Sequence, residues 1–129
     1  MDEHEYILRK LAICDDAFVE SILAGSGENL EASHLDPKTH ALVRIAALVG
    51  TDAAAPSYMA CVEEALAHGA TLDEIVGTLV AVMPSPGCGR VVSAAPRLGL
   101  AIGFDVGGAL EGTSQSEPGS KRPRLSAVE

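Results

Sequence analysis

The sequence predicts an all-α protein, a compact bundle of about five to six helices. Apolar side chains recur near the helical period over residues 3–23, with charged residues between them. Two later segments carry helix-start signals, Asp36-Pro37 and the pair Thr71 and Glu74. Hydrophobic residues make up 47% of the chain and aromatic residues only 3%, so the core must consist of aliphatic side chains.

The first predicted helix covers residues 3–23 and ends near Gly25. Residues 25–34 are rich in Gly, Ser, Asn and Glu, which is typical of a loop. A second helix is predicted at residues 38–49, after Asp36-Pro37, because Asp caps free amides and proline loses no hydrogen bond in the first turn.

A third helix lies within residues 52–71, with Pro56 in its first turn and Gly69 at its end. Thr71 and Glu74 form the capping-box pattern at the start of a fourth helix, residues 72–83. The helices predicted at 38–49 and 72–83 are apolar around nearly their whole circumference. Such helices need cover on all sides, so we expect a homo-oligomer.

The last predicted helix covers residues 88–102, and Pro96 should kink or split it. Asp105 can cap a short final turn that ends near residue 110. Residues 112–129 contain almost no apolar side chain and predict a disordered tail. The expected organisation is therefore one helical domain, residues 1–111, followed by this tail.

Charge and cysteine content narrow the function classes. The net charge of −9 disfavours a nucleic-acid partner, since an acidic surface repels phosphates. The acidic amino terminus lacks a secretory pattern, and no apolar run approaches the length of about 20 residues that spans a bilayer. Three cysteines without a CxxC pair indicate a reduced, cytoplasmic protein with no zinc site, and we expect no metal or cofactor.

Ala54, Ser57 and Cys61 are spaced i, i+3 and i+7 within the third predicted helix. This spacing places the three side chains on one stripe of the helix. Whether the stripe carries chemistry depends on Cys61, which is either a reactive thiol with Ser57 as a hydrogen-bond partner or a small buried core residue. No base adjoins it on its own helix, because His68 lies about 10 Å further along the axis. His68 pairs with Glu64 or sits at the helix end, and His40 can approach the stripe from the preceding helix.

Three segments of the sequence form a recognisable set: Leu-Asp-Pro-Lys-Thr at 35–39, Ala-Leu-Ala-His-Gly-Ala-Thr at 65–71, and Asp-Glu-Ile at 73–75. With these segments, residues 35–103 resemble the carboxymuconolactone decarboxylase and alkylhydroperoxidase D-like family. It implies an all-helical fold that assembles into homotrimers or homohexamers.

Redox members of this family carry a CxxC pair followed four residues later by a histidine. Aligned on the segment at 65–71, these positions fall on Ala54, Ser57 and Cys61, so none of the three matches. The resemblance therefore implies a non-redox homo-oligomer with a degenerate active site, a binding or structural protein that holds a small-molecule ligand. The alternative is an enzyme that acts through Cys61, as a single-thiol oxidoreductase or as a decarboxylase-like lyase. A lactone acid substrate would require cations, and the chain offers Arg44, Arg90 and Arg97.

Overall fold

The computed structural model describes residues 2–116, and every regular element in this range is an α-helix. The predicted all-α class is confirmed, but the described residues form eight helices rather than five to six. The helices are α1 (Glu3–Ala12), α2 (Asp16–Leu23), α3 (Ser26–Ser33), α4 (Pro37–Thr51), α5 (Ala55–Ala67), α6 (Leu72–Val82), α7 (Cys88–Ala101) and α8 (Val106–Ser116).

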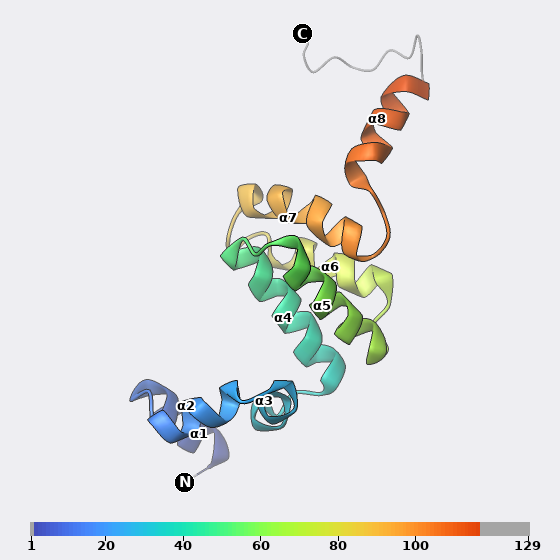
Figure 1. Cartoon of the computed structure of the whole chain (residues 1–129). Helices are drawn as coiled ribbons and strands as arrows, with labels where there is room; N and C mark the ends of the chain where they lie inside the picture. The colour runs from blue at the N-terminus through green and yellow to red at the C-terminus, as the bar shows by residue number, and fades with distance from the viewer. Residues whose placement is uncertain (1, 117–129) are drawn as a thin grey trace.

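Helices α4–α7 form the core. Helix α4 packs against α5 and α6, and α5 also packs against α7. The buried apolar side chains all come from residues 41–98, whereas α1, α2 and α3 contain no buried residue. Figure 1 shows α1–α3 as a separate group below the bundle, while α8 extends from the opposite end. We refer to α1–α3 as the N-terminal unit and to α4–α7 as the bundle.

The two capping signals are confirmed. Asp36 accepts a hydrogen bond from the Thr39 amide at 2.9 Å at the start of α4. At the start of α6, the Glu74 amide donates to Thr71 Oγ1 at 3.0 Å and the Thr71 amide donates to Glu74 Oε1 at 2.9 Å. Both partners satisfy amides that the first helical turn leaves free. Gly69 has a φ of 90°, a left-handed conformation that glycine adopts without steric cost.

Two predictions for the first 34 residues are wrong. The single helix expected over residues 3–23 is broken, because Cys14 adopts a φ of 52° and Asp15 then caps α2 by accepting from the Phe18 amide at 3.0 Å. The loop expected at residues 25–34 is helix α3. Asn29 accounts for much of this difference, since its side chain bonds to both α2 and α4 and so fixes a polar segment in place.

The carboxyl-terminal half differs in two further ways. Pro96 neither splits nor ends α7, which runs from residue 88 to residue 101. Proline has no amide hydrogen, so Pro96 leaves the Val92 carbonyl without its helical hydrogen bond. Val92 is largely exposed, so water can bind this carbonyl instead. Asp105 does cap α8, because its Oδ1 accepts from the Gly108 amide at 3.1 Å, but the helix continues to residue 116 and so passes the expected boundary at 111. The rest of the predicted tail, residues 117–129, lies outside the described residues.

Candidate functional site

The stripe formed by Ala54, Ser57 and Cys61 runs from the start of α5 into the core. Ala54 is the N-cap residue of α5, and Ser57 lies exposed in the first turn. Cys61 is a free thiol with 6% of its surface exposed. In the described part of the chain no hydrogen bond joins Ser57 to Cys61, so the expected pair of catalytic residues is not brought together.

Burial decides the protonation of Cys61. Loss of hydration raises the pKa of its thiol above the ordinary value, and the positive charge of Arg44 opposes this shift while Glu64 adds to it. The thiolate is the reactive form of cysteine. Near neutral pH this side chain is therefore a neutral thiol packed in the core, as in a structural cysteine.

Neither histidine serves as a base for the stripe. His40 is only 5% exposed, and its Nε2 lies 2.7 Å from Asn29 Oδ1, which can only accept, so Nε2 carries the hydrogen. Asn29 in turn donates from Nδ2 to the Ile22 carbonyl at 3.0 Å. His40 thus ties α4 to the N-terminal unit. His68 lies 3.6 Å from Glu64, which confirms the pairing expected from the sequence.

Arg90 and Arg97, which the sequence offered for binding an anionic substrate, both face Asp52. Arg97 Nη1 lies 2.9 Å from Asp52 Oδ1 and 3.0 Å from the Ala53 carbonyl, and Arg90 Nη1 lies 3.7 Å from Asp52 Oδ2. Ser93 donates a further bond to Asp52 at 3.0 Å. The bond from Ser93 and then that from Arg97 lower the pKa of Asp52. These cations hold the end of α4 against α7.

Tyr58 follows Ser57 on α5 and points into the core. Its side chain is fully buried, and its hydroxyl has no hydrogen-bond partner among the described residues. Burial raises the pKa of this phenol, so the hydroxyl stays protonated.

One cavity does contain an unmatched cation. A pocket of about 410 Å³ lies between α2, α3 and α4, and its lining includes Arg44 together with Asn29. Arg44 Nη1 donates to Ser26 Oγ at 3.3 Å. The sequence did not predict this pocket. Residues 25–34 were expected to form a loop, and nothing in that polar segment indicates that Ser26 and Asn29 face α4.

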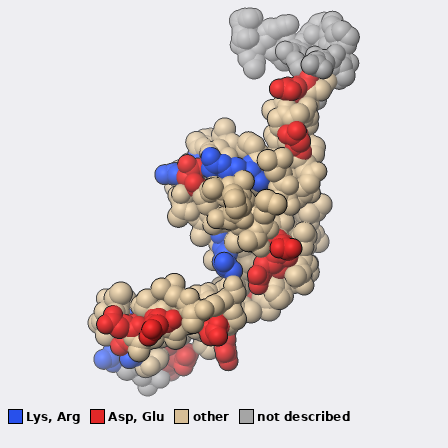
Figure 2. All heavy atoms as spheres, in the orientation of Figure 1, with Lys and Arg blue, Asp and Glu red and all other residues tan. Residues whose placement is uncertain are grey.

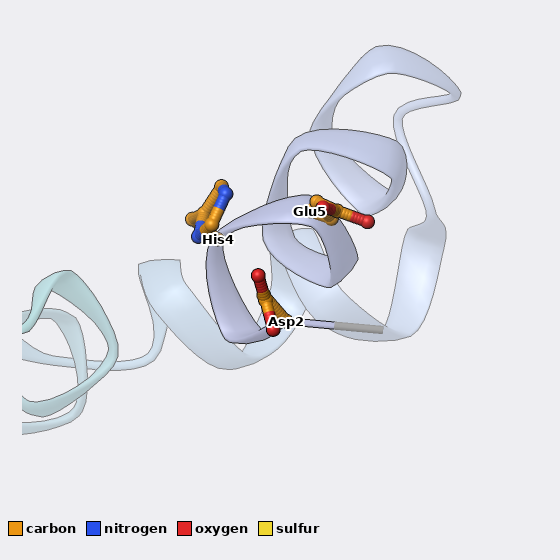
Figure 3. Close-up of side chains that lie close together, drawn as sticks. All are labelled: Asp2, His4 and Glu5. Atoms are coloured by element: carbon orange, nitrogen blue, oxygen red, sulfur yellow. The ribbon is translucent and has the colours of Figure 1, made fainter.

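Asp2, His4 and Glu5 lie close together on the first turn of α1 (Figure 3). Their potential ligand atoms lie within 4.8 Å of one another, and all three side chains are exposed. Exposed acidic groups of this kind are common on protein surfaces, and this one has no buried partner that would orient its ligands. Figure 2 shows that acidic side chains also occur over the rest of the N-terminal unit, so the cluster belongs to a generally acidic surface.

No protein-family model matches the chain, and neither a curated protein nor a solved structure matches it. Within residues 2–116, no helix combines the length and the hydropathy needed to cross a bilayer.

Proposed function

We propose that the protein is a non-redox, carboxymuconolactone decarboxylase-like homo-oligomer, a trimer or hexamer, that binds a small molecule and performs no thiol chemistry. The burial of Cys61 is the observation that carries this proposal. A dithiol centre needs two accessible thiols at the spacing of one helical turn, and this helix has Ala54 and Ser57 in their place. The one thiol on this helix, that of Cys61, is buried and protonated.

Self-association is supported by exposed apolar surface on α4 and α6. Val80 of α6 is 72% exposed, and Val43 of α4 and Val76 of α6 are also exposed. A separate open groove of about 380 Å³ lies between α4 and α6. Its mainly apolar lining includes Val43 but neither Val76 nor Val80. Contiguous apolar surface of this kind is typical of protein interfaces. These are the two helices whose all-round apolar pattern led to the oligomer prediction.

Sedimentation equilibrium tests the assembly. We expect a mass three or six times the monomer value of 13.3 kDa at micromolar concentration. Val80→Glu should shift the protein toward the monomer, because it places a charge in an apolar contact. Leu110→Glu, an equally exposed apolar position on α8, is the matched control and should leave the mass unchanged. A wild-type protein that sediments as a stable monomer would overturn the assembly.

Alkylation distinguishes the binding protein from the alternative enzyme that acts through Cys61. The proximity of Arg44, which favours the thiolate, is the one observation on the side of the enzyme. With iodoacetamide near neutral pH, we expect rapid labelling of the exposed Cys14 and Cys88, which serve as internal controls. Cys61 should react only after denaturation. Labelling of native Cys61 at the rate of Cys88 would favour the single-thiol oxidoreductase or lyase instead.

A further inference from the structure

The open pocket between the N-terminal unit and α4 has the size of a ligand site. Its volume of about 410 Å³ lies within the usual range for small-molecule pockets. Ile22 and Leu23 of α2 provide apolar walls, and Ser26, Asn29 and Arg44 provide polar groups. Apolar side chains beside polar groups that can fix its orientation allow a pocket to bind an amphipathic small molecule.

Among the described residues, Arg44 has no acidic partner, unlike four other cations. Lys10, Lys38, Arg90 and Arg97 each lie within 4.0 Å of a carboxylate oxygen. Across residues 2–116, Arg44 has no such ion pair, and the Ser26 hydroxyl is its hydrogen-bond acceptor. In a chain with a net charge of −9, carboxylates are abundant, so an arginine without one that faces a cavity has unused capacity for an anion.

The geometry around Arg44 is fixed by a neighbouring polar network. Buried His40, one turn earlier on α4, bonds to Asn29, and Asn29 bonds to the Ile22 carbonyl. These bonds connect α3, which lines the pocket, to α4 and to α2. The carboxylate of Glu28 lies close to Gly25. A Cβ added at Gly25 would be only 2.7 Å from Glu28 Oε1. Glu28 thus lies in the first turn of α3. Among the described residues it forms no ion pair with Arg44, so the guanidinium can bind an anionic group of a ligand.

We propose that this pocket binds a small organic carboxylate with an apolar chain. The carboxylate accepts hydrogen bonds from the Arg44 guanidinium and from the Ser26 hydroxyl, and the apolar chain packs on Ile22 and Leu23. The inference rests on the proposed binding function and names its ligand class. It places the site at the junction of α2, α3 and α4.

Octanoate is the probe, titrated into the full chain by calorimetry and by amide NMR. We expect saturable binding, with shifts concentrated at residues 22–29 and around residue 44. Arg44→Gln should weaken binding about tenfold or more, because it removes a charge-assisted hydrogen bond. Arg44→Lys, which keeps the charge, should retain part of the affinity and shows that loss in the Gln variant is not a folding defect. Arg90→Gln is the matched control and should bind as the wild type does. Octanamide, the neutral isostere, should bind more weakly than octanoate by the same factor as Arg44→Gln.

Three results would overturn the inference. The first is equal affinity of Arg44→Gln and wild type for octanoate. The second is equal binding of octanoate and octanamide, which would show adsorption to exposed apolar surface. The third is a change in sedimentation mass in Arg44→Gln, which would assign the guanidinium to an acidic side chain of another copy. Loss of octanoate binding in a protein that still sediments as a trimer or hexamer would contradict this site alone, and octanoate binding by a monomer would contradict the assembly alone.

Discussion

Replacement of Ile45 by alanine is expected to lower the free energy of unfolding by about 2–5 kcal/mol, the usual cost of a large-to-small change in a well-packed core. Ile45 has no exposed surface and lies in the middle of α4, the helix that packs against α5, α6 and α7. The core to which it belongs consists mostly of short aliphatic side chains, which fill only part of the cavity that alanine leaves. Urea denaturation followed by far-UV circular dichroism measures the loss, and Ile45→Val should cost only about 0.5–1.5 kcal/mol.

Leu8→Ala is the control for this substitution. Leu8 is 62% exposed on α1, in a unit without a buried residue. The change should stay within about 0.5 kcal/mol, as for most surface substitutions. Equal losses at Leu8 and Ile45 would contradict the assignment of the stabilising core to the bundle.

Gly99→Ala is expected to destabilise the protein by about 1–3 kcal/mol, as overpacking usually does. A Cβ at position 99 would lie 2.8 Å from the Phe104 carbonyl oxygen and 2.8 Å from Val106 Cγ2. The Phe104 amide donates to the Gly99 carbonyl at 2.7 Å, so this backbone cannot move away without losing a hydrogen bond. Thermal denaturation measures the effect, with a lower melting temperature as the expected result.

Gly77→Ala provides the opposite case in the interior of α6. No atom lies within 4 Å of a Cβ added there, so the substitution should stabilise the helix by up to about 1 kcal/mol. If Gly99→Ala were as well tolerated as Gly77→Ala, the close approach of α7 to the segment before α8 would be wrong.

Local signals in the sequence predicted the bundle well. Asp36 and the Thr71–Glu74 pair act within one turn of helix, so their effect does not depend on distant residues. The N-terminal unit was predicted poorly because its structure depends on tertiary contacts. The break at Cys14 requires a left-handed residue that is not glycine, and α3 is tied down by the bonds of Asn29 to other helices.

The same distinction applies to the candidate site. The positions of Ala54, Ser57 and Cys61 follow from the periodicity of one helix, and the structure places Cys61 in the core, one of the two roles left open for it. The pocket at Arg44 joins residues that lie 18 positions apart in the chain. Periodicity within one element carries no information about that contact, because it arises only when α3 packs on α4.

Because α1–α3 contain no buried residue, the N-terminal unit adds no side chain to the core of the bundle, and its detachment should cost less than unfolding of the bundle. Its polar links to α4 are the His40–Asn29 and Arg44–Ser26 bonds, which adjoin the pocket. Detachment therefore removes one wall of the pocket and releases any carboxylate held there. A ligand that binds only the attached form would oppose opening by about 2.7 kcal/mol at a hundred times its dissociation constant. Under such linkage, ligand concentration sets the fraction of molecules in which the first three helices are docked.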